Sequence, residues 1–265
     1  MVERKLTLAQ RFRTIRVERR EGVCTIELNK PPLNIIDMEM MGEMQAALAE
    51  IESDPGVRVM VFRGAGDKGF SAGVSIQEHT PDKIGEMIPR FHAVFRQFAR
   101  TEKITIAAVH GVCLGGGFEL AAMCDLVVAA ENAQFGQPEI KLGQLPPVGI
   151  ILLPYLIGYR KAAELVLTGA TIGAREAMSL GLVNRVVAEN ELSECTDNMV
   201  RELTAGSGST LRLTKSILRR VAGLDFERAL DESERFFLDT VAATEDAKEG
   251  VFAFLEKRAP KWKER

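Results

Sequence analysis

Residues 104–139 read ITIAAVHGVCLGGGFELAAMCDLVVAAENAQFGQPE, and this stretch decides the fold expected for the chain. The apolar run from Ile104 to Val109 predicts a buried strand. Three consecutive glycines, residues 115–117, end that run, and a helical pattern begins at Phe118. A strand that leads through glycines into a helix exposes backbone N–H groups, which favour a developing negative charge. The stretch therefore predicts a strand–turn–helix unit that can stabilise an anion.

Two carboxylates flank this turn. Glu119 lies at the start of the expected helix, and Glu139 follows twenty residues later. That gap fits a helix, a strand and a loop returning to the same sheet edge, so both acids are expected to face one pocket. Paired carboxylates suit acid–base catalysis, because one takes a proton from water while the other supplies a proton to carbon. The same residues are also compatible with a simple tight turn and a glutamate that only complements the helix dipole.

The longer run 107–143, AAVHGVCLGGGFELAAMCDLVVAAENAQFGQPEIKLG, resembles the signature of the enoyl-CoA hydratase (crotonase) superfamily. Similarity continues at residues 32–34 (PLN), 69–73 (GFSAG) and 254–258 (FLEKR), and covers the chain from about Thr14 onward. The resemblance implies an α/β fold, a crotonase-like spiral of repeated ββα units with a C-terminal helical oligomerisation region. It also implies an acyl-CoA substrate and assembly as a homotrimer or a dimer of trimers.

The composition argues against several classes of function. The chain has 34 basic and 37 acidic residues, a formal charge of -3 and a pI near 5.8, so no overall field attracts nucleic acid or an anionic membrane. The four cysteines show no CxxC spacing and the three histidines no ligand pattern, so we expect reduced thiols and no metal. The N-terminus lacks the apolar core of a secretory signal, and no apolar run reaches membrane-spanning length. We therefore expect a cytoplasmic protein.

Alternating strands and helices are expected on either side of the central stretch. Strands are predicted at residues 14–19, 23–28 and 57–62, and helices at 38–52, capped by Asp37, and at 81–99. The strand–helix–strand order predicts parallel pairing with a right-handed crossover. From Glu189 the pattern is nearly all helical, so we expect an α/β core with the active site in residues 1–190 and a helical region in residues 191–265. The resemblance assigns oligomerisation and part of the CoA site to the second region.

The resemblance also assigns roles to individual residues. The backbone N–H groups of Val74 and Gly116 form an oxyanion hole for the thioester oxygen, Glu119 activates water, and Glu139 protonates the α-carbon. No metal, nicotinamide or flavin cofactor is needed, because coenzyme A is part of the substrate. The residues expected to bind the substrate or its CoA part are Leu33, Ile35, Phe70, Ala72, Ile76, Gly115, Leu145, Pro147, Phe237, Phe254 and Lys257.

Two segments depart from the pattern of hydratases for straight-chain substrates. Those enzymes usually have Ala-Asp after the loop glycine and Pro-Gly-Ala-Gly-Gly after the second acid, whereas this chain has VS at 74–75 and PPVGII at 146–151. Bulky apolar residues in place of glycine are expected to reshape the acyl pocket. The motifs SAGVSIQEHTPDK, CLGGGFE, FGQPEIKLG and LPPVGIILLP resemble those of the cyclohexa-1,5-diene-1-carbonyl-CoA hydratases of anaerobic aromatic degradation.

This narrower resemblance implies hydration of cyclohexa-1,5-diene-1-carbonyl-CoA to 6-hydroxycyclohex-1-ene-1-carbonyl-CoA, a step of benzoyl-CoA degradation. The alternatives are a hydratase for linear enoyl-CoA substrates, an enoyl-CoA isomerase, or a non-catalytic protein of the same fold that binds RNA. The presence of both acids favours hydration over isomerisation, and the acidic pI argues against RNA. His79, five residues past Val74, is assigned no role.

Overall fold

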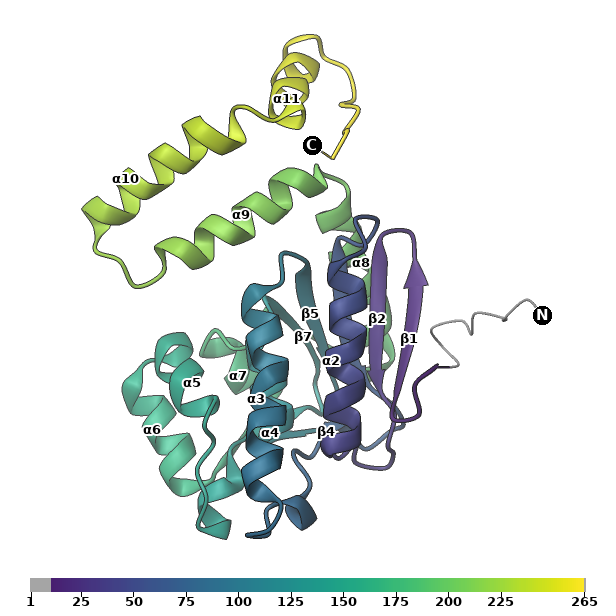
Figure 1. Cartoon of the computed structure of the whole chain (residues 1–265), viewed down its shortest axis with the longest axis vertical. Coiled ribbons are helices and arrows are strands. Elements are labelled where there is room, and N and C mark those ends of the chain that lie inside the picture. Colours follow the sequence, from purple (N-terminus) through teal and green to yellow (C-terminus); the bar gives the residue numbers. More distant parts are fainter. Residues whose placement is uncertain (1–10, 265) are drawn as a thin grey trace, which may run out of the picture.

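The computed structural model describes residues 11–264, which form two sheets, covering helices and a projecting group of C-terminal helices (Figure 1). The main sheet has the order β1-β2-β3-β5-β7-β10, and the smaller sheet has the order β4-β6-β8-β9. The main strands are β1 (Ile15–Arg20), β2 (Val23–Leu28), β3 (Val59–Gly64), β5 (Ile104–Val109), β7 (Leu126–Ala130) and β10 (Arg185–Val187). The smaller sheet consists of β4 (Gly69–Ser71), β6 (Val112–Leu114), β8 (Gln134–Gly136) and β9 (Thr171–Gly173).

The predicted order of the first elements is confirmed. β1 and β2 pair as an antiparallel hairpin, and β2, β3, β5 and β7 then run parallel. Helix α2 (Met38–Glu52) begins where predicted, because the Asp37 carboxylate accepts a hydrogen bond from the N–H of Met40 at 3.0 Å. Helix α3 (Ile84–Arg100) begins later than residue 81, since residues 81–83 form a turn.

The smaller sheet is not foreseen by the sequence pattern, because strands of three residues are too short to show an alternation. β4 pairs parallel with β6, and β6 pairs parallel with β8. Chain direction is therefore the same in all three, and the segments that follow them leave from one edge of the sheet. That edge carries the candidate site.

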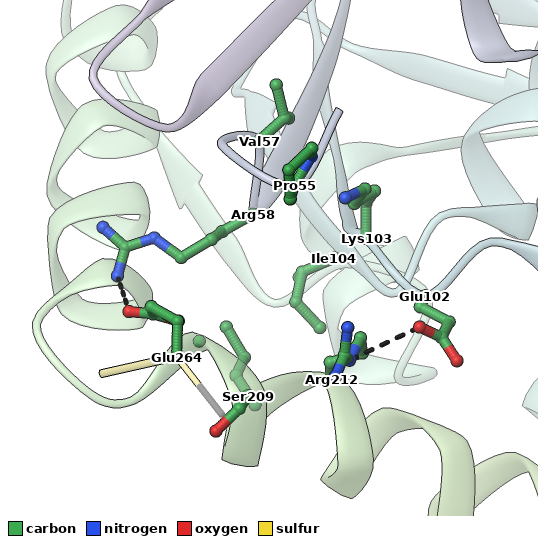
Figure 2. Close-up of a pocket in the computed structure, with 11 residues that line it drawn as sticks. Pro55, Val57, Arg58, Glu102, Lys103, Ile104, Ser209, Arg212 and Glu264 are labelled. Carbon is green, nitrogen blue, oxygen red and sulfur yellow. Dashed lines mark hydrogen bonds and ion pairs between the residues drawn. The ribbon is translucent and has the colours of Figure 1, made fainter. Parts of the chain in front are cut away.

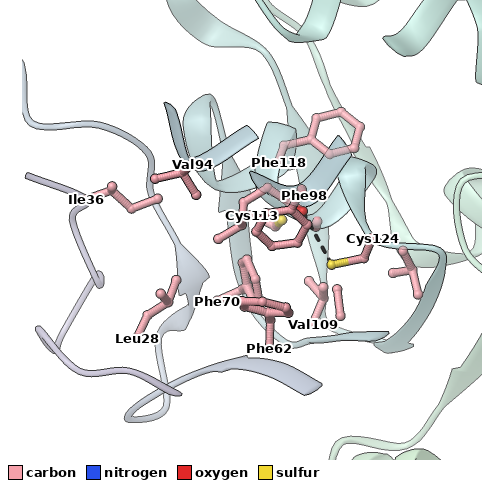
Figure 3. Close-up of a cluster of buried hydrophobic side chains, with 14 of the residues drawn as sticks. Leu28, Ile36, Phe62, Phe70, Val94, Phe98, Val109, Cys113, Phe118 and Cys124 are labelled. Atoms are coloured by element: carbon pink, nitrogen blue, oxygen red, sulfur yellow. Dashed lines mark hydrogen bonds between the residues drawn. The ribbon is translucent and has the colours of Figure 1, made fainter. Parts of the chain in front are cut away.

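The hydrophobic core lies between the main sheet and helices α2, α3 and α4 (Gly116–Met123), and Figure 3 shows its centre. The rings of Phe62 and Phe98 join β3 to α3, with centroids 4.9 Å apart. The rings of Phe118 and Phe135 join α4 to β8 at 5.4 Å. Because Phe118 directly precedes Glu119, this packing fixes the orientation of the helix that carries the first acid.

The remaining elements surround this core. They are the 3-10 helices η1 (Ile76–Glu78), η2 (Pro138–Leu142) and η3 (Glu189–Glu191), and the helices α5 (Gly149–Ile157), α6 (Tyr159–Thr168) and α7 (Ala174–Ser179). α5 packs against α4 and α6, and η2 packs against α6. In the described range, no helix combines the length and the apolarity needed to cross a bilayer.

The C-terminal part is helical, as predicted, but its first helix packs directly against the main sheet. Met199 and Val200 of α8 (Leu192–Thr204) are buried against the outer face of β3, β5 and β7. α9 (Gly208–Val221) is held by buried Lys215 and by Arg219, which pair with Asp125 at 2.7 and 3.0 Å. Beyond it, α10 (Phe226–Phe236), the π-helical turn η4 (Phe237–Val241) and α11 (Glu245–Leu255) project away from the sheets (Figure 1).

Candidate active site

Three loops meet at the carboxyl edge of the smaller sheet. The segment after β4 carries Val74, the segment after β6 carries Gly116, and the segment after β8 carries Glu139. Neighbouring parallel strands deliver their loops to one place, which is where α/β proteins commonly bind ligands. The short strands absent from the sequence prediction therefore bring the predicted residues together.

The residues that carry the two candidate oxyanion donors lie side by side. A Cβ built on Gly73 would stand 3.4 Å from the nitrogen of Gly116, and one built on Gly116 would stand 2.6 Å from Cγ2 of Val74. α4 begins at Gly116, so this N–H is among the first amides of the helix, which have no partner inside it. Within residues 11–264, neither the Val74 nor the Gly116 N–H donates to a protein acceptor. Both donors are thus available to an oxygen bound from outside.

Glu119 is buried and held by the start of another helix. Its side chain is 2 % exposed, and its Oε1 accepts hydrogen bonds from the N–H groups of Val148 and Gly149 at 2.8 and 2.7 Å. The pKa of Glu119 is raised to about 7, mainly by burial and in addition by the charge of Glu139, while the two amide hydrogen bonds act to lower it. A carboxyl with a pKa near neutrality can accept and release a proton at physiological pH.

Glu139 faces the glycine turn, as the paired-acid prediction requires. A Cβ on Gly115 would stand only 2.7 Å from Oε1 of Glu139, and Gly115 has a φ of +52°, which favours glycine. Burial raises the pKa of Glu139 above its usual value. Since the charge of Glu139 also acts on Glu119, the two acids belong to one electrostatic site.

Gln137 is a further polar residue here that the sequence reasoning missed. It is fully buried, and when its amide nitrogen faces Glu139 that nitrogen lies 3.1 Å from both carboxylate oxygens. Its position two residues before Glu139, across Pro138, was the available signal. Sequence alone does not show that a glutamine in a turn is buried.

The predicted substrate-binding residues fall into three groups: residues near the site, a residue buried in the core, and residues on the C-terminal helices. In the first group, the N–H of Ala72 donates to the Leu33 carbonyl oxygen at 2.9 Å, and Leu33, Ile76 and Leu145 expose apolar side chains. Ile35 and Pro147 are partly buried, and Gly115 is buried. Phe70 is placed differently from the expectation of a contact surface, because its side chain is fully buried in the core.

The third group lies elsewhere in the same chain. Phe237, Phe254 and Lys257 belong to or follow the projecting C-terminal elements, at the opposite end of the molecule from α4 and β4 (Figure 1). Phe237 and Phe254 are exposed. One chain therefore does not bring these three residues to its own paired acids.

A cavity of about 110 Å³ lies at the other end of the main sheet (Figure 2). It is lined by residues at the amino ends of β3 and β5 and at the start of α9, whereas the acids lie beyond the carboxyl ends of the strands. Its arginines are paired, Arg58 with Glu264 and Arg212 with Glu102, each at 3.4 Å. In residues 11–264, no group of His, Cys, Asp and Glu side chains is arranged to hold a metal ion.

Comparison with known proteins identifies the class to which this fold and site belong. The family profile described as enoyl-CoA hydratase/isomerase matches residues 18–265. A probable enoyl-CoA hydratase of Mycobacterium bovis, echA8, is 40 % identical over 96 % of this chain and 99 % of its own length. The solved structure of an enoyl-CoA hydratase subunit from Geobacillus kaustophilus has a TM-score of 0.89 and 37 % identity, covering 96 % of this chain and 99 % of that one. The chain belongs to the enoyl-CoA hydratase/isomerase family, with the α/β crotonase fold.

The narrower resemblance is only partly supported. The cyclohexa-1,5-dienecarbonyl-CoA hydratase of Thauera aromatica is 34 % identical over 94 % of this chain and 96 % of its own length. This identity is lower than that to the mycobacterial protein, so overall similarity does not single out a cyclic substrate.

A first prediction concerns the stability cost of the buried acid. The folded-state pKa of Glu119, about 7, is above the ordinary value of 4.5, so its contribution to stability is complete below about pH 4.5 and is lost as the pH rises through 7. Glu119→Gln retains an acceptor for both amides but carries no charge. We expect this variant to be more stable than wild type at pH 8, by on the order of 3 kcal/mol, with little difference near pH 4.5. Urea unfolding at both pH values measures this, and equal stabilities at pH 8 would contradict it.

Proposed function

We propose that this protein adds water to, or removes it from, a conjugated acyl-CoA thioester. The coarser assignment, an enzyme of the enoyl-CoA hydratase type, follows from family membership. The observation that carries the finer proposal is the meeting of two acids with two unpaired main-chain amides at one sheet edge. In this proposal Glu119 and Glu139 perform acid–base catalysis, while Val74 and Gly116 bind the thioester oxygen.

The chemistry follows from charge movement in the substrate. When the water oxygen bonds to the β-carbon, the electrons of the double bond move towards the thioester oxygen, which becomes enolate-like. The two amide donors stabilise that oxygen, each by about 3 kcal/mol, and the positive end of α4 adds to the effect. Glu119 takes the proton that water loses, and Glu139 gives a proton to carbon. Protons and electrons balance without a metal or redox cofactor.

We propose cyclohexa-1,5-diene-1-carbonyl-CoA as the substrate and 6-hydroxycyclohex-1-ene-1-carbonyl-CoA as the product. In this ring the enolate electrons continue through the second double bond. The proton is therefore delivered to the far carbon of that bond, and the α-carbon remains in a double bond. The motif around residues 146–151 supports this proposal, because apolar residues stand there in place of glycines, and the segment adjoins Glu119 through the N–H of Val148. A flat ring offers more apolar area to such a wall than a short linear chain does.

The test is a substrate panel followed by the ultraviolet absorbance of the conjugated thioester. We expect kcat/KM for the cyclic dienoyl-CoA to exceed that for crotonyl-CoA by about a hundredfold, as complementary burial of several extra ring carbons allows. Product analysis in D₂O should locate deuterium at the far carbon of the second double bond. Equal or faster turnover of crotonyl-CoA would remove the cyclic assignment and leave the linear-chain hydratase. Double-bond migration without net hydration would favour an isomerase.

A homotrimer, or a dimer of trimers, is part of the proposal. The projecting helices expose large apolar side chains that nothing in one chain covers, among the described residues, including Phe226, Phe237, Phe252, Phe254 and Leu255. Burial of such a surface against other copies is favourable. It would also allow Phe237, Phe254 and Lys257 to reach the CoA part of a substrate held by a neighbouring copy. Sedimentation velocity tests the assembly, and a stable monomer would contradict it.

A binding protein for RNA is the remaining alternative. Two free amides and two acids with raised pKa values suit a reacting thioester better than they suit a polyanion, because two carboxylates repel phosphate. Salt-sensitive RNA binding without turnover of any enoyl-CoA would reverse this preference.

A further inference from the structure

The first turn of α5 contacts Glu119 directly, and it reaches Glu139 only through the side chain of Gln137. Its amides, Val148 N–H and Gly149 N–H, hold Oε1 of Glu119 directly. The bare Cα of Gly149 also faces Gln137, since a Cβ there would stand 2.7 Å from the Gln137 amide and 3.1 Å from Cβ of Pro146. The Gln137 amide in turn faces the carboxylate of Glu139.

We propose that Gln137 is a positioning residue for Glu139, and that Gly149 is required because any side chain there would displace the Gln137 amide. This inference rests on the proposed function for the role of Glu139, but the contacts themselves do not depend on the substrate. The start of α5 then sets the geometry of both acids. Its amides bind Glu119, and the missing side chain of Gly149 leaves room for the Gln137 amide that faces Glu139.

The burial of Gln137 makes its contact with Glu139 energetically important. The residue is fully buried, so its amide has no water with which to exchange partners, and a buried amide without a hydrogen bond is costly. A neutral N–H donor facing a carboxylate favours the ionised form and fixes the plane of the carboxyl group. The carboxylate of Glu139 also lies next to Gly115 in the glycine turn, so both Gln137 and Gly115 border it.

The atoms around Gly149 show which group a methyl substituent at this position would displace. The one atom within 3.0 Å of the added Cβ is at the end of the Gln137 side chain and not in the backbone. A side-chain end yields more readily than a strand or helix, so Gly149→Ala is expected to fold and to turn the Gln137 amide away from Glu139. The N–H of residue 149 remains available to Glu119.

The first arm of the test uses Gln137→Met, which keeps the length of the side chain and removes its donors. We expect kcat for hydration to fall roughly ten- to a hundredfold, with KM changed less than about twofold, because a hydrogen bond to a charged group is lost while substrate contacts remain. Gln134→Met on β8 is the matched control, because Gln134 is exposed on the preceding strand. Its kinetics are expected to equal those of wild type.

The second arm asks whether Gly149 acts through Gln137. Gly149→Ala alone should lower kcat by a similar factor, and the double variant with Gln137→Met should be no slower than Gln137→Met alone. Gly42→Ala on α2, where nothing lies within 4 Å of the added Cβ, controls for the methyl group itself. Multiplicative effects in the double variant would overturn the link between the two residues.

The third arm does not use activity. Infrared titration of the carboxylate band, taken as wild type minus Glu139→Gln, reports the ionisation of Glu139. Gln137→Met should raise the pKa of Glu139 by about one unit or more, because a donor to the ionised form is lost. An unchanged titration would overturn the inference even if every variant were active. A wild-type chain that hydrates no enoyl-CoA, but shows the shift, would instead refute the proposed function and leave the positioning contact in place.

Discussion

Replacement of Glu139 by Gln, or of Glu119 by Gln, is expected to lower kcat by about 10³-fold in each case, within the range of 10²–10⁴ that general acid–base catalysis contributes. In the proposed mechanism the two acids transfer different protons, and burial raises the pKa of each. The substitution preserves shape and removes only the transferable proton. Initial rates with a saturating enoyl-CoA measure the effect.

The control for these variants is Glu194→Gln. Glu194 is an exposed residue on α8, a helix that carries neither of the two acids. It is expected to keep wild-type rates. Circular dichroism and thermal unfolding establish that the variants at Glu119 and Glu139 are folded. A variant at either acid with more than a tenth of wild-type kcat would show that the residue transfers no proton in the limiting step.

The second large effect is expected from Gly116→Ala. The added methyl group would stand 2.6 Å from Cγ2 of Val74 and 2.7 Å from Cζ of Phe91. Phe91 is buried and Val74 packs against the core, so neither withdraws freely. The two proposed oxyanion donors, the N–H groups of Val74 and Gly116, must then separate, and kcat should fall by about 10²–10³-fold, as when one such donor is removed.

Gly42→Ala is again the matched substitution, because it adds the same methyl group in open space within α2 and should stabilise the helix slightly. Binding of a saturated acyl-CoA by Gly116→Ala, measured by calorimetry, should change much less than kcat, since the enolate oxygen exists only in the transition state. Equal losses in ground-state affinity and in kcat/KM would show that the methyl group blocks the pocket and does not misalign the donors.

The main sheet and its helices could be predicted because their signals are long. The strand at Ile104–Val109 is apolar except for Thr105, and α2 has both a capping side chain and an apolar stripe. The smaller sheet could not be predicted, since its three-residue strands are defined by pairing with distant segments and not by their own composition. The site is built on that sheet, so the sequence indicated which residues matter without showing what brings them together.

The same limit applies within the site. Glu119 and Glu139 could be selected because carboxylates beside a glycine turn have a recognisable chemistry. The partners that hold them, the amides of Val148 and Gly149 and the side chain of Gln137, are read only from coordinates. Main-chain donors carry no residue signature, and Gln137 shows its role only through its complete burial.

The double duty of α5 has a consequence for how this enzyme can change. Residues 146–151, the segment proposed to shape the acyl pocket, also supply the amides that bind Glu119. Mutations selected there for a new acyl group will therefore alter proton affinity at the same time. We expect substrate range and pH optimum to change together in laboratory evolution. Variants with a broader substrate range but an unchanged pH optimum should carry their mutations in other elements of the chain.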